Sequence, residues 1–129
     1  MLLNQCPHNL DLLQWIFGLP SKVTANCQFG RFHNIEVEDA VTALLEYSSG
    51  ATGVFITTTG EAPGTNRLEV ACDRGRIVLE NGKLTFTRTE QLVSEHTKTA
   101  PNGFEKPAVW NVDIPLPAGY GEQHIGIMK

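Results

Sequence analysis

The chain has 129 residues, of which 41% are hydrophobic and 19% charged, a composition typical of a globular chain that folds as one domain, residues 1–129. Its net charge of −4 and scattered Lys and Arg provide no basic face for a phosphate backbone, which argues against nucleic acid as a partner. No apolar run approaches the roughly 18 residues that a membrane span requires, so no membrane partner is expected.

The first predicted element is a helix that ends near Phe17. Apolar side chains at Leu10, Leu13 and Phe17 recur at helical spacing, and a glycine and a proline follow directly. Because proline is favourable only in a first turn, the helix starts at Cys6 or Pro7, or one turn earlier with a distortion. One face of this helix is expected to be buried.

After residue 20 the hydrophobic period changes to two, which predicts strands separated by glycine turns. In the clearest strand, 41–47, Val41, Ala43 and Leu45 share one face. It forms an antiparallel hairpin with 52–59, and the Asn81-Gly82 pair is typical of a second hairpin with a type I′ turn. The other predicted strands cover residues 22–29, 68–72, 76–79, 84–87 and 109–114.

One helix and about six mostly antiparallel strands predict an α+β fold with two layers, in which the helix packs on one open sheet. The second face of that sheet carries Leu44, Phe55 and several threonines and therefore needs a partner surface. Residues 89–107 are polar and aperiodic and are interpreted as a long loop. A helical pattern begins near Glu122 and stops where the chain ends.

The sequence carries none of the common nucleotide, hydrolase or zinc motifs, GxGxxG included. None of its histidines has a second histidine or a cysteine at ligand spacing, so no metal site is expected. Three cysteines without a CxxC pair favour a reducing cytoplasm. His96 and His124 lie in polar surroundings and are expected to be solvated, while His33 lies beside Arg31 in a loop or strand end, where a surface role is favoured over a ligand contact.

His8 differs from the other histidines because Asn4 precedes it by four residues and Asp11 follows it by three. In a helix these three side chains lie along one side. Two interpretations stay open at this point: a local hydrogen bond at the helix start, which spacing alone favours, or a pair of polar groups that points into a cleft.

Three segments carry a resemblance to a known family: "LLNQCPHNLDLLQWIFGLPSKV", "VEDAVTALLEYSSGATGVFITTT" and "PGTNRLEVACDRGRIVLENGKLTF". They resemble the C-terminal domain of the glucose–fructose oxidoreductase and inositol dehydrogenase (Gfo/Idh/MocA) family, NAD(P)-dependent oxidoreductases that act on sugars and polyols. The resemblance runs from about Leu2 to Phe86, and "GEQH" at 121–124 is similar again. Members of the family hold the cofactor in an N-terminal Rossmann domain, whose motif this sequence lacks.

The resemblance implies roles for two residues, since family members carry a D/N-x-x-x-H pair that faces the nicotinamide. It makes His8 the catalytic proton acceptor, and it makes Asn4 and His8 the substrate-binding pair. Asn4 stands where inositol dehydrogenases have aspartate, and an amide orients a hydroxyl but cannot share a charge. The "FEKP" at 104–107 is like the lysine motif of the family, but it lies in the irregular late segment and is not assigned.

The resemblance thus predicts the substrate-binding and oligomerisation domain of an NAD(P)-dependent sugar or polyol oxidoreductase. Such a domain has no cofactor site of its own, takes NAD or NADP from the full-length enzyme, is inactive alone and forms a homo-oligomer through its open sheet face. The alternative is a stand-alone, non-catalytic binding or dimerisation module. A small histidine-dependent isomerase is a third hypothesis with less support.

Overall fold

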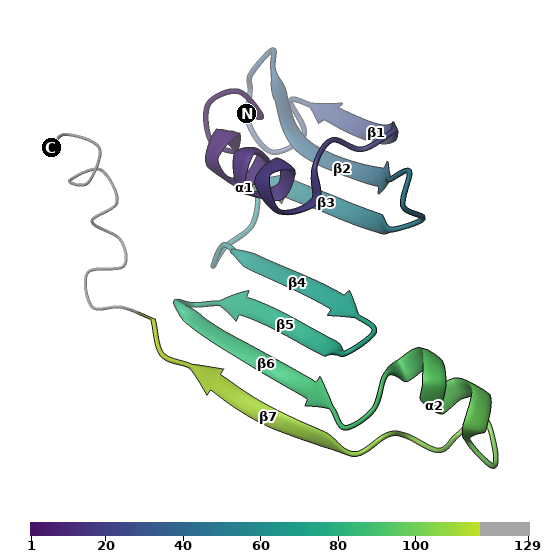
Figure 1. Ribbon diagram of the computed structural model, residues 1–129. Helices are drawn as coiled ribbons and strands as arrows, with labels where there is room; N and C mark the ends of the chain where they lie inside the picture. The colour runs from purple at the N-terminus through teal and green to yellow at the C-terminus, as the bar shows by residue number, and fades with distance from the viewer. Residues whose placement is uncertain (117–129) are drawn as a thin grey trace, which may run out of the picture. The chain divides into compact units, whose positions relative to one another are not determined.

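The computed structural model describes residues 1–116, which form two compact units, Met1–Gly64 and one that begins at Thr65. All strand pairs in both units are antiparallel, and the α+β class is confirmed (Figure 1). Neither helix described in this part of the chain is long and apolar enough to cross a membrane. In chain order the elements are α1 (Pro7–Phe17), β1 (Lys22–Phe29), β2 (Glu38–Glu46), β3 (Thr52–Thr58), β4 (Arg67–Cys72), β5 (Gly75–Glu80), β6 (Lys83–Thr89), α2 (Val93–Thr99) and β7 (Val109–Ile114).

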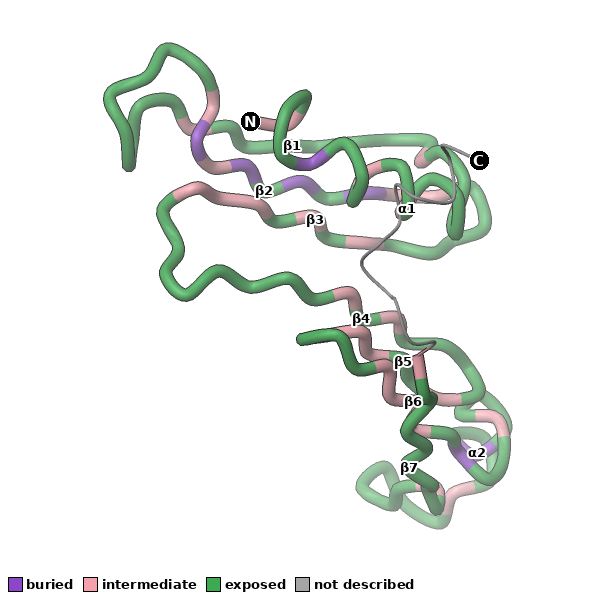
Figure 2. Tube along the Cα trace, turned by 90° about the vertical axis from the view of Figure 1, so that its left-hand side faces the viewer, coloured by how far each residue is buried: buried purple, intermediate pink, exposed green. Residues whose placement is uncertain are grey.

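The first unit is a three-stranded sheet in the order β1-β2-β3, with α1 over one face. The side chains of Val41, Ala43 and Leu45 on β2 are buried on that face, as their alternation predicts (Figure 2). The ring of Phe17 at the end of α1 lies 6.2 Å from the ring of Tyr47. The helix does not fill the face completely, because an apolar pocket of about 270 Å³ remains between it and the sheet.

The face of the first sheet that points away from α1 is largely exposed. Leu44, Val54 and Ile56 on this face keep 45%, 64% and 67% of their surface in contact with solvent. Phe55 does not belong to it, contrary to the expectation from sequence. It pairs with Ala43 across β2 and β3, and cross-strand partners share a face, so its ring lies on the α1 side.

The second unit is a four-stranded sheet in the order β4-β5-β6-β7. Asn81 and Gly82, with φ angles of 51° and 69°, join β5 to β6 and confirm the predicted turn with two positive φ angles. One face carries the ion pair of Arg67 with Glu80. The register places most apolar residues of the four strands on the opposite face, among them Leu68, Val70, Ile77, Leu79, Leu84, Phe86, Val112 and Ile114.

Two features of this architecture differ from the sequence-based expectation. The strands form two sheets rather than one, because no strand of the first unit pairs with a strand of the second in the described residues. The stretch 89–107, expected to be a loop, contains the helix α2. The predicted helix start at Glu122 lies outside the described residues.

Candidate functional site

The candidate site is the beginning of α1, where Asn4 and His8 lie on either side of the helix start. Residues 2–5 form a turn in which the amides of Asn4 and Gln5 donate to the Met1 carbonyl oxygen at 3.1 and 2.9 Å. The helix begins directly afterwards at Pro7, in agreement with the predicted start. His8 is therefore a first-turn residue of α1, and Asn4 precedes the helix.

Contacts on both sides of this turn attach it to the first sheet. Cys6, only 5% exposed, lies with its Sγ 3.1 Å from the Thr57 Oγ1 on β3. The Met1 ammonium group and the Leu2 amide both donate to Glu38 Oε1, at 3.0 and 2.8 Å. The hydrogen bond from the Leu2 amide is the largest of the effects that lower the pKa of Glu38. The backbone that carries His8 is thus anchored to both β2 and β3.

Both predicted site residues are exposed. The side chains of Asn4 and His8 lie at the surface of the first unit, and so does Asp11, the third residue of the sequence pattern. This position rules out a role for His8 in the packing between the helix and the sheet. The side chain of His8 is thus on the solvent-exposed surface at the helix start.

The other histidines have different environments. His33 is exposed in the β1–β2 connection, and its Nδ1 lies 3.1 Å from Thr59 Oγ1. His96, expected to be solvated, is buried in α2. Its ring nitrogens lie 2.6 Å from the Gln91 side-chain amide and 3.2 Å from the Glu105 carbonyl oxygen, so its polar sequence neighbours enclose it. His124 lies outside the described residues.

Within residues 1–116, no group of three or more His, Cys, Asp or Glu side chains could hold a metal ion. A dinucleotide site requires a glycine-rich turn from a strand into a helix. The strand-to-helix connection between β6 and α2 consists of Glu90, Gln91 and Leu92 and has no glycine. The described residues therefore contain no phosphate-binding turn of the Rossmann type.

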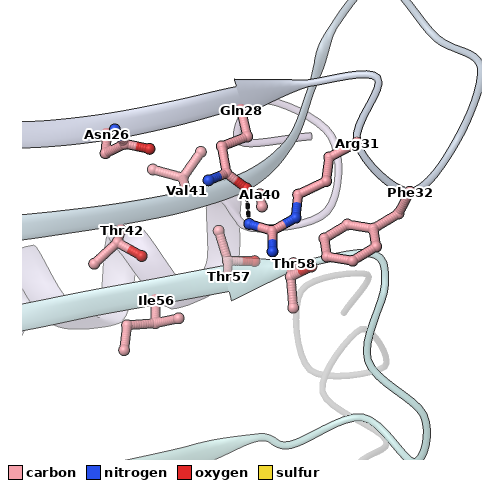
Figure 3. Close-up of a pocket in the computed structure, with 10 residues that line it drawn as sticks. All are labelled: Asn26, Gln28, Arg31, Phe32, Ala40, Val41, Thr42, Ile56, Thr57 and Thr58. Atoms are coloured by element: carbon pink, nitrogen blue, oxygen red, sulfur yellow. Dashed lines mark hydrogen bonds between the residues drawn. The ribbon is translucent and has the colours of Figure 1, made fainter.

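A pocket of about 220 Å³ with both polar and apolar lining residues, at one end of the first sheet, was not predicted from the sequence (Figure 3). Arg31 borders it from the β1–β2 connection, which is held by the fully buried carboxyl group of Asp39. One sequence feature could have indicated this anchor. Asp39 precedes Val41 by two residues and therefore lies on the buried face of the same strand, with Val41 and Ala43. A buried charged side chain requires hydrogen-bonding or charged partners.

A comparison with known protein families gives one match. The model of the GFO/IDH/MocA C-terminal domain matches residues 1–78, more than half of the chain. The chain belongs to this family. In this GFO/IDH/MocA domain the match covers the whole first unit, the candidate site included, and continues through β4 into β5. The comparison with curated proteins finds no match.

Proposed function

We propose that the chain is the substrate-facing domain of an oxidoreductase that acts on a CH–OH group of a sugar or polyol, with His8 as the proton acceptor. The observation that carries this proposal is the family match, which begins at the segment that holds Asn4 and His8. The exposure of both side chains on an anchored helix start supports it.

In this proposal a neutral ring nitrogen of His8 accepts the proton of the substrate hydroxyl, a role suited to imidazole because it exchanges protons near neutral pH. The side-chain amide of Asn4 both donates and accepts hydrogen bonds and so orients the hydroxyl without carrying a charge. The hydride acceptor, NAD or NADP, is assigned to a separate nucleotide-binding domain, because residues 1–116 have no glycine-rich turn from a strand into a helix.

The role of His8 is tested in a protein in which these residues follow a nucleotide-binding domain. Replacement His8→Ala should lower kcat by about 10²–10⁴-fold, the usual effect of losing a positioned acid or base, and should leave the far-UV circular dichroism spectrum unchanged. Asn9→Ala, at the next exposed position of the same helical turn, is the control and should keep the parent rate. Parent turnover in the His8→Ala variant would reject the assignment.

The chain of 129 residues alone should neither bind NAD(H) or NADP(H) measurably nor oxidise a polyol. The reason is the lack of a glycine-rich phosphate turn among the described residues. Titration calorimetry with each cofactor checks this expectation. A micromolar dissociation constant for either cofactor would contradict it.

We further propose that the domain forms a homo-oligomer through the face of the first sheet that points away from α1. Its exposed apolar residues favour a contact that buries at least ~1,200 Å² in total. Light scattering at tens of micromolar should give the mass of a dimer or a larger assembly. The Val54→Glu variant should be monomeric, because the interface would bury an unpaired charge at this position, which is 64% exposed in the single chain. The control Ser49→Glu, in the β2–β3 turn, should associate like the parent.

A further inference from the structure

The pocket of about 220 Å³ on the first sheet results from the strand register. Gln28, Ala40 and Thr58 are directly opposite one another across the three strands and share the face that points away from α1. Ala40 contributes only a methyl group between two longer side chains, so the sheet surface is hollow at this point. In the neighbouring row, Thr42 lies between Asn26 and Ile56 and completes the floor (Figure 3).

The β1–β2 connection forms the wall of the pocket, and its position is fixed by Asp39. Asp39 Oδ2 accepts hydrogen bonds from the amides of Phe32 and His33 at 2.6 and 3.2 Å. The ring of Phe32 packs directly on Gly60, where a Cβ atom would come within 2.3 Å of the ring. These contacts hold the segment that carries Arg31 against the end of β3.

Arg31 is oriented into the pocket by two neighbours. Its Nη1 donates to Gln28 Oε1, and its guanidinium carbon lies 5.1 Å from the centroid of the Phe32 ring. Guanidinium has five N–H donors in a planar fork that matches a carboxylate. Gln28 engages one of them in the described part of the chain, which leaves the fork able to bind an oxyanion.

The chemistry of the lining selects the kind of ligand. Among residues 1–116, Arg31 is the one charged residue that lines the pocket, and no carboxylate of this part of the chain lines it. The other polar residues of the lining donate and accept hydrogen bonds through the amides of Asn26 and Gln28 and the hydroxyls of Thr42, Thr57 and Thr58. The volume of about 220 Å³ holds about seven water-sized groups of roughly 30 Å³ each, which suits a small molecule rather than a nucleotide.

We propose that this pocket binds a small hydroxylated carboxylate, with the carboxylate on the Arg31 guanidinium and the ligand hydroxyls on the Thr42 hydroxyl and the Asn26 amide. The inference does not depend on the proposed oxidoreductase activity, because it uses neither Asn4 nor His8. The Phe32 ring beside the guanidinium supplies an apolar wall for the carbon chain of the ligand.

The test titrates the full chain with four probes and follows binding by calorimetry and by the backbone amide shifts of residues 26–33 and 40–42. Gluconate, which has both groups, should bind. Acetate, which lacks the hydroxyls, should bind at least tenfold more weakly, and glucose, which lacks the charge, should not bind measurably. Gluconate that binds no better than acetate, or inorganic phosphate that binds more tightly than gluconate, would overturn the assignment.

Variants identify the pocket as the site. Arg31→Gln should weaken gluconate binding at least tenfold, and Thr42→Val, which removes a hydroxyl at nearly constant volume, should weaken it by about threefold to tenfold. Lys22→Gln, which removes a cation at the other end of β1 on the same face, is the matched control and should bind like the parent. An equal loss in Lys22→Gln, or unchanged affinity in Arg31→Gln, would show binding elsewhere and overturn the proposal.

Titration of the Val54→Glu variant with gluconate tests ligand binding in the pocket separately from self-association of the domain. The pocket lies at one end of the face proposed for self-association, and Ile56 belongs to both. Val54 does not line the pocket, so the Val54→Glu monomer, in which this face is uncovered, should bind gluconate at least as tightly as the parent. If a folded Val54→Glu monomer no longer bound gluconate, the proposal that a single chain forms the whole pocket would be overturned.

Discussion

Asp39 is a buried carboxylate whose charge is balanced by backbone amides rather than by a cation. Burial alone would raise its pKa, but hydrogen bonds from the backbone amides of Phe32, Arg31 and His33 outweigh that effect and hold the pKa below the ordinary value of 3.8. Since the lowered pKa belongs to the folded state, the ionised carboxylate stabilises the β1–β2 connection above about pH 3.8. This contribution is lost as the pH falls through the folded-state pKa.

Replacement Asp39→Asn should therefore loosen the β1–β2 connection already at neutral pH, because an amide is a weaker acceptor than a carboxylate. We expect hydrogen exchange of the Phe32 and His33 amides to become about tenfold faster, the equivalent of losing about 1.4 kcal/mol of local protection. Glu36→Gln, at an exposed position of the same connection, is the control and should leave both amides protected. Unchanged protection in Asp39→Asn would contradict the anchoring role.

At the scale of single elements, α2 depends on a residue from another part of the chain. Its own N-cap position, Leu92, supplies no side-chain hydrogen bond. Instead Asp73, in the β4–β5 turn, accepts from the amide and the hydroxyl of Ser94, both at 2.7 Å, and these bonds lower the pKa of Asp73. The Asp73 carboxylate thus caps the N-terminus of α2 and lies at the positive end of the helix dipole.

Asp73→Ala should accordingly destabilise α2 and leave the β4–β5 hairpin intact. We expect exchange of the Ser94 to His96 amides to become roughly fivefold faster, as for the loss of an N-cap. Asp113→Ala, on the exposed strand β7, is the control and should not affect α2. Faster exchange throughout β4 and β5 would mean instead that Asp73 supports the hairpin.

Gly75, at the start of β5, allows the close approach of β6. Its φ of +131° is rarely adopted by other residues, and a Cβ atom there would lie 2.1 Å from the Thr87 carbonyl oxygen. Gly75→Ala should lower the free energy of unfolding of the second unit by at least about 2 kcal/mol, measured by urea denaturation followed at the Trp110 indole. Gly103→Ala, at a site with no heavy atom within 4 Å of an added Cβ, should lower it far less.

At the scale of the whole molecule, the elements were more predictable than their assembly. The bounds of β1 and β7 agree with the predicted strands. The buried face of β2 follows the sequence alternation, because alternation reports which side chains face a core. The division into two sheets was missed because periodicity does not specify which strands pair. The helix α2 was missed because its cap, Asp73, lies about twenty residues earlier in the chain.

The position of the candidate site could be predicted from the sequence, but the contacts that hold it against the sheet could not. The start of α1 followed from Pro7 and from the apolar spacing, and the resemblance pointed to Asn4 and His8. The contacts of Cys6 with Thr57 and of Met1 with Glu38 join residues more than thirty positions apart, which no local pattern reveals. The pocket beside Arg31 could not be predicted from local patterns either, because it depends on how β1, β2 and β3 pair.

The attachment of α2 to the β4–β5 turn has a consequence for the order in which the second sheet folds. Two residues join β5 to β6, whereas residues 90–108 separate β6 from β7. Closing this longer segment costs more chain entropy, and that cost grows with the logarithm of the loop length. Once Asp73 holds α2, only the residues after Thr99 remain to be closed. The Asp73 carboxylate thereby lowers the entropy cost of pairing β7 with β6, although Asp73 is remote from β7 in sequence. We expect β7 to be the last strand whose amides become protected from exchange during refolding.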